Sequence, residues 1–223
     1  MKIVSWNCNG AFRKKYEHII TLDAGIYVIQ ECEPPDKWTK EMSVVITNYI
    51  WEPGVAKNGV LVFARSDIKL IRLPWKNHGM KVFIPIMVND LFKLIAVWTT
   101  KNAYIEDFFI WQSVYADEID NNTVIIGDFN SNAIWDKDHG EKCHTNVVKS
   151  LHNKCLDSVY HYVFHELQGQ ESIPTYYARR HVNCPYHIDD CYANIASIQS
   201  YNVLSEDWLQ YSDHVPIVFV RKD

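Results

Sequence analysis

The chain has 223 residues, of which 48% are hydrophobic and 22% are charged. This is the composition of a globular protein with a large core and not of a disordered chain. No repeat, low-complexity tract or linker interrupts it, so we expect one domain over residues 1–223. The net charge of -5 gives no overall attraction to nucleic acid, which usually binds a basic stripe. The basic clusters at Arg13–Lys15 and Arg179–His181 are small, and each is equally well explained as a solvated surface.

Cysteine spacing and hydropathy indicate in which cellular compartment the protein is expected. None of the six cysteines forms a C-x-x-C pair, so a zinc site or redox motif is weakly supported. No secretory signal precedes the first strand, and no stretch approaches the length of a membrane span. Reduced thiols in a cytoplasmic protein are the simplest interpretation. We expect no membrane association and no obligatory protein partner.

Hydrophobic periodicity and turn residues predict the secondary structure. In chain order, the pattern predicts a strand at Lys2–Trp6, a helix at Phe12–Leu22, strands at Gly25–Glu31, Val44–Ile46, Gly59–Ala64, Val82–Val88 and Phe92–Thr99, a helix at Tyr104–Ile119, a strand at Thr123–Ile126, a helix at Thr145–His152, and strands at Ile188–Ile195 and Val215–Val220. Most of these strands are not separated by helices, whereas parallel α/β folds alternate the two. The sequence therefore predicts an α/β fold, a sandwich of two mixed β-sheets flanked by helices.

Polar side chains recur at the ends of the predicted strands. They are Asn7, Glu31, Asp128, Asn130, Asp189, Asp213 and His214. Most of these positions, taken alone, are more simply explained as a turn or a solvated strand end. Asp189 differs because it lies in an otherwise apolar stretch, where a charge needs a partner, and His214 is the natural candidate.

Taken together, these residue types suit the hydrolysis of a phosphate ester. Carboxylate and amide oxygens are the ligands of hard cations such as Mg²⁺ or Mn²⁺. A buried Asp–His pair fixes the state of one imidazole, and a second Asp with a nearby Asn can orient a water molecule. A glycosidase needs only two carboxylates, which would leave the Asp–His pair and Asn7 unexplained.

Five segments occur in a recognisable order along almost the whole chain. They are Val4–Gly10 (VSWNCNG), Val28–Glu33 (VIQECE), Ile125–Asn132 (IIGDFNSN), Tyr186–Ala193 (YHIDDCYA) and Tyr211–Phe219 (YSDHVPIVF). Together they resemble the endonuclease/exonuclease/phosphatase superfamily, similar to exonuclease III, apurinic endonucleases and deoxyribonuclease I. The resemblance implies a single catalytic domain folded as a four-layered α/β sandwich, with its site at one end of two central sheets. It also implies a phosphodiesterase or phosphatase that depends on Mg²⁺ or Mn²⁺.

The resemblance also implies a role for each matching position. Asn7 and Glu31 would hold the metal, with Glu31 as the main ligand, and Asp213 would help to place it or a second ion. Asp128 would orient or deprotonate the attacking water, and Asn130 would bind the phosphate.

The last two matching positions form the acid–imidazole pair. Asp189 would pair with His214, which would contact a phosphate oxygen and stabilise negative charge there.

Two positions depart from the pattern. Where related enzymes often have His or Tyr at the end of the strand in Leu94–Thr100, this chain has Trp98, whose indole has one N–H donor and no titrating group. Proton donation from Trp98 is therefore not expected, although it can donate one hydrogen bond or simply pack. Asn102 is a candidate phosphate contact shortly after it. Asp190 puts a charge where an aromatic residue is common, with an effect that the sequence does not define.

Other aromatic and basic residues are candidates for binding the substrate. Trp135 either stacks on a base or deoxyribose near the site or packs under its loop. Tyr176 and Tyr177, with Arg179 and the following arginine, either line a strand-binding groove or form an ordinary exposed loop.

The most direct hypothesis is a metal-dependent phosphodiesterase that cleaves nucleic acid, chiefly a DNA endo- or exonuclease, by in-line attack of water. Short loops at Pro53–Asn58 and Trp75–Gly79, together with the acidic net charge, argue against tight duplex binding. A small-molecule or lipid phosphoesterase of the same superfamily is the alternative. A non-catalytic binding module is disfavoured, because every main catalytic position except that of Trp98 has a competent residue.

Overall fold

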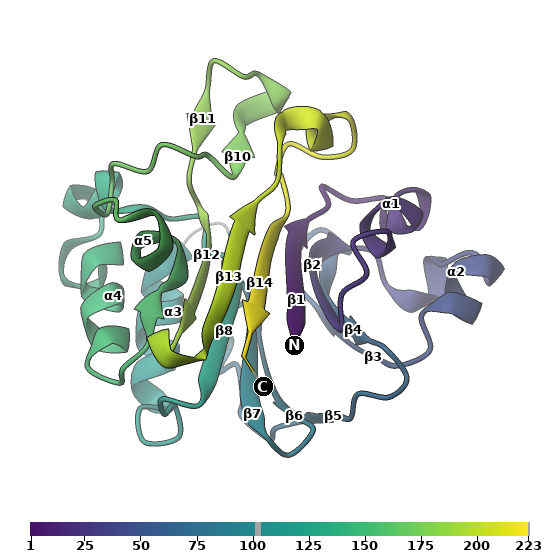
Figure 1. Ribbon diagram of the computed structural model, residues 1–223, viewed down its shortest axis with the longest axis horizontal. Helices are drawn as coiled ribbons and strands as arrows, with labels where there is room; N and C mark the ends of the chain where they lie inside the picture. The colour runs from purple at the N-terminus through teal and green to yellow at the C-terminus, as the bar shows by residue number, and fades with distance from the viewer. Residues whose placement is uncertain (101–103, 223) are drawn as a thin grey trace.

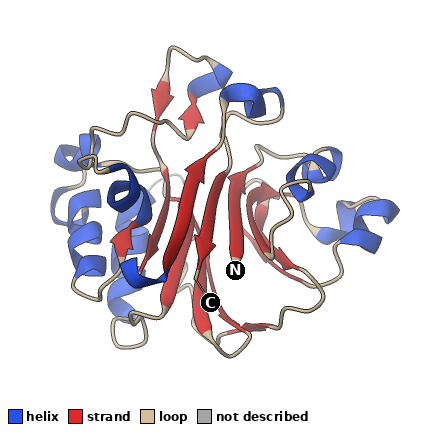
Figure 2. Cartoon of the chain, viewed as in Figure 1, coloured by secondary structure: helices blue, strands red, loops and turns tan. Residues whose placement is uncertain are grey.

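The protein is described here by a computed structural model that covers residues 1–100 and 104–222. Two six-stranded mixed sheets pack face to face, with helices on their outer faces (Figures 1 and 2). The first sheet has the order β13 (Ile198–Val203), β14 (Ile217–Arg221), β1 (Lys2–Asn7), β2 (Ile26–Cys32), β4 (Gly59–Ala64) and β3 (Tyr49–Pro53). The second has the order β5 (Leu70–Arg72), β6 (Phe83–Val88), β7 (Phe92–Trp98), β8 (Thr123–Asp128), β12 (Asp189–Ala193) and β9 (Asp157–Ser158). This arrangement confirms the predicted α/β sandwich.

The described α-helices are α1 (Tyr16–Ile20), α2 (Lys40–Val45), α3 (Tyr104–Val114), α4 (His144–His152) and α5 (Val159–Phe164). Four of these five helices cover the two sheets from opposite sides, whereas the buried side chains of α5 join the core between the sheets. Buried side chains of α1 and α2 pack on the first sheet, and those of α3 and α4 pack on the second. A small separate hairpin, β10 (Tyr176–Tyr177) and β11 (Pro185–Tyr186), rises above the sheets (Figure 1). No helix in the described ranges is long and apolar enough to cross a membrane.

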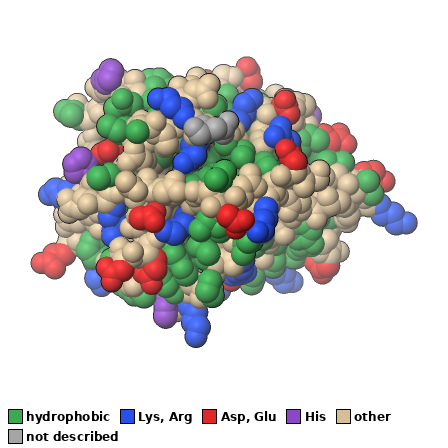
Figure 3. Space-filling view, turned by 60° about the horizontal axis from the view of Figure 1, so that its bottom comes forward, with side chains coloured by type: hydrophobic (Ala, Val, Ile, Leu, Met, Phe, Trp, Pro, Cys, Tyr) green, Lys and Arg blue, Asp and Glu red, His purple; other side chains and the backbone are tan. Residues whose placement is uncertain are grey.

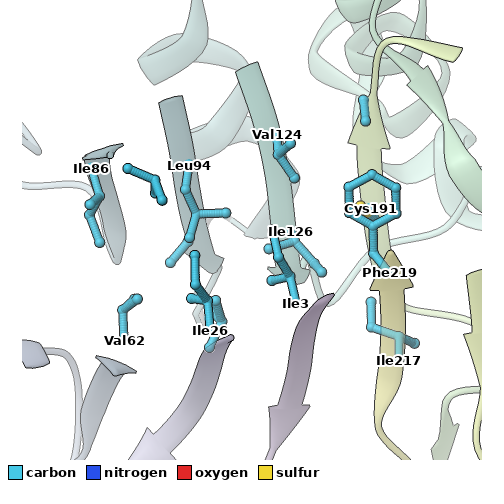
Figure 4. Close-up of a cluster of buried hydrophobic side chains, with 14 of the residues drawn as sticks. Ile3, Ile26, Val62, Ile86, Leu94, Val124, Ile126, Cys191, Ile217 and Phe219 are labelled. Carbon is cyan, nitrogen blue, oxygen red and sulfur yellow. The ribbon is translucent and has the colours of Figure 1, made fainter. Parts of the chain in front are cut away.

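The central core lies between the two sheets. It contains aliphatic side chains from alternate positions of the strands, since successive residues of a strand point to opposite faces. Figure 4 shows side chains of the two sheets facing one another, among them Ile3, Ile26 and Val62 from the first and Ile86, Leu94 and Ile126 from the second. Burying such residues is the main force that joins the two sheets.

Each sheet contains one parallel pair, and this pair positions the polar strand ends. β1 is parallel to β2, with Asn7 opposite Gln30, and β7 is parallel to β8, with Trp98 opposite Asp128. The other pairs within the two sheets are antiparallel. Parallel strands end at the same edge, so the ends of β1 and β2 meet, as do those of β7 and β8.

Three of the predicted elements differ from the structure. The strand expected at Val44–Ile46 is wrong, because these residues form the C-terminal end of helix α2. Thr39 caps the N-terminal end of the same helix, where its side chain accepts a hydrogen bond from Met42 N at 3.2 Å. The helix expected at Phe12–Leu22 is reduced to a 3-10 turn and α1, and the helix from Tyr104 ends at Val114. The valines of α2 are 76% and 53% exposed, so their β-branched shape was a misleading signal.

Candidate active site

The predicted strand-end residues meet at the upper edge of the two sheets (Figure 1). Asn7 ends β1 and Asp128 ends β8, while Asp189 begins β12 directly opposite Asp128 in the antiparallel register. His214 comes from the segment just before β14. Residues that lie far apart in the sequence therefore converge because both sheets present an edge at this end of the molecule.

Asp128 is at the centre of the first group of contacts. Its side chain is fully buried and accepts hydrogen bonds from Asn7 Nδ2 at 2.8 Å, Asn130 N at 2.8 Å and Asn130 Nδ2 at 2.9 Å. Burial, followed by the charge of Asp189, raises the pKa of Asp128 to about 7. A carboxylate with this pKa can both accept and release a proton near neutral pH.

Asp189 and His214 form the second group. His214 Nδ1 lies 2.8 Å from Asp189 Oδ2, and both side chains are buried. Burial opposes the imidazolium, but the charge of Asp189 and its hydrogen bond outweigh it, and Asp128 and Asp213 add to the effect, so the pKa of His214 rises to about 10. The ring is therefore cationic at neutral pH. Ligand atoms of Asp128, Asp189 and His214 all lie within 4.8 Å of one another.

A bulge in β2 directs Glu31 toward this cluster. The pairing of β2 with β4 shifts register between Ile29 and Cys32, and Glu31 has a left-handed φ of 57°. Such bulges re-aim side chains beside functional sites. Glu31 Oε1 accepts from Asn7 Nδ2 at 3.1 Å, so Glu31 and Asp128 share one amide donor.

The orientation of Asn7 bears on its predicted role as a metal ligand. Its Nδ2 faces the two carboxylates, and its Oδ1 accepts from Asn9 N at 3.0 Å. Ligation through Oδ1 would require the amide to rotate and release Asn9. In this structure Asn7 acts as a hydrogen-bond donor that holds the two acids together.

Two buried hydroxyl groups that the sequence patterns did not single out support the cluster. Thr175 Oγ1 accepts from the backbone N–H groups of Ile188 and Asp189, each at 3.0 Å. Ser212 Oγ donates to Asn7 O at 2.7 Å and accepts from His214 N at 3.2 Å. The bond from Ser212 to Asn7 joins segments that are 205 residues apart in the chain. Only the position of Ser212 next to the Asp-His pair could have pointed to it.

Asp213 lies at the edge of the cluster. Its Oδ1 is 3.4 Å from Ser212 Oγ, and its backbone oxygen accepts from Tyr177 N at 2.8 Å. The carboxylate of Asp213 is half-buried, and its charge acts on both His214 and Lys15.

The predicted substrate residues occupy different environments. Trp98 is 4% exposed and belongs to the central core, where its ring packs against Gly54. Of the two roles expected for Trp98, its position therefore favours packing. Trp135 is half-buried, with its ring centroid 5.3 Å from that of Tyr186. Arg179 is exposed, in a left-handed conformation with φ 56°. Asn102 lies outside the described residues.

Asp190 faces away from the cluster, as expected of the residue after Asp189 in a strand. It accepts from Ser158 Oγ at 3.1 Å and from the Tyr192 hydroxyl at 3.3 Å. Its charge is thus held in a separate buried polar network on the helix-covered face of the second sheet. His144 is also part of this network, with Nε2 at 3.9 Å from Asp190.

The chain matches no protein-family model and no curated protein sequence. Its fold is similar to solved structures. These include a 3'-5' exonuclease from Neisseria meningitidis (TM-score 0.69, 19% identity, 100% of both chains covered), the catalytic domain of Xenopus laevis APE2 (0.71, 17%, 100% of this chain and 92% of that one) and an AP endonuclease from Archaeoglobus fulgidus (0.68, 15%, 100% of both).

The similarity extends over 92–100% of the length of these three structures. At such low identity it shows the arrangement of the chain and not the substrate. The chain has the fold of the exonuclease III/deoxyribonuclease I-like superfamily.

Proposed function

We propose that this protein is a metal-dependent phosphodiesterase that hydrolyses nucleic acid, as a DNA endo- or exonuclease. The observation that supports this most strongly is the buried cluster of Asp128, Asp189 and His214, with ligand atoms within 4.8 Å of one another. It places a base with a near-neutral pKa beside an imidazolium, and hydrolysis of a phosphodiester uses both groups.

Asp128 is the proposed general base. Its pKa of about 7 lets it take a proton from an attacking water, and its hydrogen bonds to Asn7 and Asn130 fix the carboxylate in one orientation. Asn130 Nδ2 also donates to Thr99 O at 3.0 Å, so both of its N–H groups are engaged. Donation from this amide to a phosphate oxygen requires one of these two bonds to be released.

His214 is the proposed electrostatic partner of the phosphate. Asp189 occupies Nδ1, so Nε2–H of the imidazolium is left to face a phosphate oxygen. The positive charge offsets the negative charge that develops in the transition state, and no solvent has to reorganise to provide it. Removing one such donor typically lowers kcat by about 10²–10³-fold.

The donor set fits a divalent cation. Glu31, Asp128 and Asp213 supply carboxylate oxygens of the kind that Mg²⁺ and Mn²⁺ prefer, and Asn7 already holds Glu31 and Asp128 on one amide. We propose Glu31 as the main ligand, with Asp213 and, after rotation of its amide, Asn7. A bound cation would polarise the phosphate and lower the pKa of a coordinated water.

Cationic and aromatic groups beside the cluster favour a nucleic-acid substrate over a small phosphoester. Lys15 Nζ donates to Cys8 O at 2.5 Å, and the charges of Arg180 and Asp213 act on its pKa, which burial lowers. The ring of Tyr176 lies 4.7 Å from that of His214. Phosphate contacts from basic side chains and stacking of bases on aromatic rings are the usual means of holding a strand. Figure 3 brings forward the end of the molecule opposite the cluster, where Lys, Arg, Asp and Glu side chains are interspersed.

A panel of substrates tests this proposal. Labelled single-stranded, duplex and abasic DNA and RNA, an inositol phosphate and a cyclic dinucleotide are incubated with Mg²⁺ or Mn²⁺ and, in parallel, with EDTA. We expect cleavage of at least one nucleic acid that EDTA abolishes. Hydrolysis of only the small phosphoesters would favour the phosphoesterase alternative. Activity that persists in EDTA would refute the proposed dependence on a metal ion.

A further inference from the structure

A cavity of about 500 Å³ adjoins the cluster on the side of Asn130. Its lining includes Asn130, Trp135, Asp138, His139, Tyr176 and Tyr186. The volume is within the range of small-molecule sites, which is about 300–1,000 Å³. The cavity is large enough for a whole nucleoside, so a bare sugar would fill little of it.

Aromatic rings form a continuous row from this cavity to the active site. The Trp135 centroid is 5.3 Å from that of Tyr186, which is 6.3 Å from Tyr176 with planes at 26°, and Tyr176 is 4.7 Å from His214. Tyr186 is 37% exposed, so the chain itself does not cover this row. A flat ring that enters the cavity therefore finds stacking partners beside the residue that we assign to the phosphate.

The charges around the cavity select against a second phosphate. Among its described lining residues there is no Lys or Arg, and Asp138 contributes a carboxylate. His139, which also lines the cavity, is engaged through Nδ1 by Glu106 Oε1 at 2.7 Å. An uncharged ring with N–H groups on its edge fits this lining, because a carboxylate accepts hydrogen bonds and repels anions.

We propose that this cavity binds one unpaired, intact base of the substrate strand, next to the phosphate that is cleaved, with Trp135 as its main stacking partner. This rests on the proposed nuclease function and narrows its substrate to strands that present an unpaired base. A base in a regular duplex is stacked and paired, so it has to be extruded before it can enter. Single-stranded or distorted nucleic acid is accordingly the preferred class.

Cleavage kinetics test the inference. Single-stranded oligonucleotides are compared with copies that have a tetrahydrofuran abasic residue at each position flanking the cut. Because stacking on an aromatic side chain is worth about 1–3 kcal/mol per base, we expect kcat/KM to fall by about 5- to 150-fold at one of these positions. Trp135→Ala should abolish this difference and Trp135→Phe should retain it. Tyr162→Ala, which removes an aromatic residue that is 48% exposed on α5, is the control and should change nothing.

Binding gives a second readout that does not need turnover. Strands with 2-aminopurine at successive positions are bound to the His214→Gln variant. We expect the 2-aminopurine fluorescence to be quenched at one position only, and this quenching to be lost in the double variant that also has Trp135→Ala. Equal cleavage of intact and abasic strands, or quenching unaffected by Trp135→Ala, would overturn the base pocket while leaving the nuclease proposal standing. A wild-type protein that cleaves no nucleic acid would instead refute the proposed function, and the binding readout would still decide on the pocket.

Discussion

Asp128 and His214 lie in one buried cluster, yet their environments move their pKa values by different means. Burial and the charge of Asp189 raise the pKa of Asp128 to about 7, whereas the surrounding carboxylates, led by Asp189, hold His214 protonated up to about pH 10 despite its burial. Pairs of groups whose environments assign one to accept a proton and the other to retain it are typical of acid–base catalysis. The charge of Asp189 therefore raises the pKa values of both Asp128 and His214.

Asp128→Asn should eliminate catalysis without unfolding the protein. The amide cannot accept a proton from water, so we expect kcat to fall by about 10²–10⁴-fold. The substitution also removes a buried charge, which makes the loss of hydrogen bonds less costly. Thermal unfolding is expected to stay within about 5 °C of wild type, equivalent to roughly 1–2 kcal/mol for a chain of this size. A variant that unfolds at room temperature would leave kcat uninterpretable, and full activity in a folded variant would contradict the assignment.

Asp189→Asn should shift the pH–rate profile toward acid. The Asp189 charge raises the pKa values of Asp128 and His214, so its removal lets Asp128 ionise at lower pH and His214 lose its proton at lower pH. If activity needs the Asp128 carboxylate and the imidazolium, the alkaline limb of kcat/KM moves from about 10 toward the ordinary histidine value of 6.5. Measurement of kcat/KM between pH 5 and 10 gives the result. An alkaline limb that stays in place would exclude His214 as its source.

At the residue scale, the sequence predicted the identity of the cluster better than its contacts. The pairing of Asp189 with His214 followed from the cost of an unpaired buried charge, and the structure contains that contact. The supporting hydroxyl groups of Thr175 and Ser212 were missed because nothing in a sequence shows which distant backbone N–H groups a hydroxyl will meet. The donor orientation of Asn7 depends on Asn9 and was equally hidden.

Close strand contacts fix the end of β8. At Gly127, φ is 153°, and an added Cβ would lie 2.0 Å from the carbonyl oxygen of Val97 in β7. Glycine is thus required by the approach of the parallel neighbour, inside the strand, and not by a turn that leaves it.

Gly127→Ala should destabilise the fold and displace Asp128. Because the clash is with backbone, relief requires β7 and β8 to separate, and we expect a loss of about 2 kcal/mol or more in the free energy of unfolding. Gly140→Ala is the matched control, since Gly140 has φ 57° with nothing within 4 Å of the added Cβ, and should cost about 1–2 kcal/mol. Urea unfolding of both variants provides the comparison, and equal losses would refute the packing explanation.

A buried acid anchors the loop that follows β8. Glu171 accepts from Gly169 N at 2.8 Å and from Asn132 Nδ2 at 3.0 Å, and lies 2.9 Å from His161 Nε2. Burial alone would raise its pKa, but these bonds, led by that of His161, lower it to about 2. Asn132 also donates to His187 O at 2.9 Å. Glu171 therefore ties the loop after β8 to helix α5, and Asn132 ties the same loop to the segment that enters β12.

Glu171→Ala should cost about 3 kcal/mol, because it leaves buried donors and an imidazole unpartnered. For a chain of this length that is a fall of roughly 6–12 °C in the unfolding temperature. Glu171→Gln keeps the shape but not the charge and should lose less. Calorimetry of wild type and the two variants separates these effects. A wild-type unfolding temperature for Glu171→Ala would show that the hydrogen bonds of Glu171 do not stabilise the fold.

At the element scale, prediction succeeded where burial imposes a period and failed where it does not. β4 and β6–β8 were located because their side chains are buried on both faces. Each of these strands therefore appears in the sequence as an apolar run. The strand β13 and the helix α5 were missed, because β13 is partly exposed and α5 has only six residues. Short or half-exposed elements depend on tertiary contacts that the sequence does not display.

At the scale of the whole molecule, the two sheets share one core and one functional edge. The central core takes side chains from both sheets, and we propose on this ground that residues 1–223 act as one catalytic domain. The first sheet supplies Asn7 and Glu31, and the second supplies Asp128 and Asp189. His214 completes the cluster from the connection between β13 and β14 of the first sheet. The architecture could be predicted because five sequence blocks kept their order, whereas the substrate depends on loop geometry that no block specifies.

We propose that the edge shared by the two sheets hydrolyses nucleic acid through Asp128 and His214. The most direct measurement is single-turnover cleavage of one labelled single-stranded oligonucleotide with Mg²⁺ or Mn²⁺, by wild type, Asp128→Asn and His214→Gln, each first shown to be folded. We expect cleavage by wild type and a loss of at least about 10²-fold in the cleavage rate of each variant. Cleavage at the wild-type rate by both folded variants would contradict it.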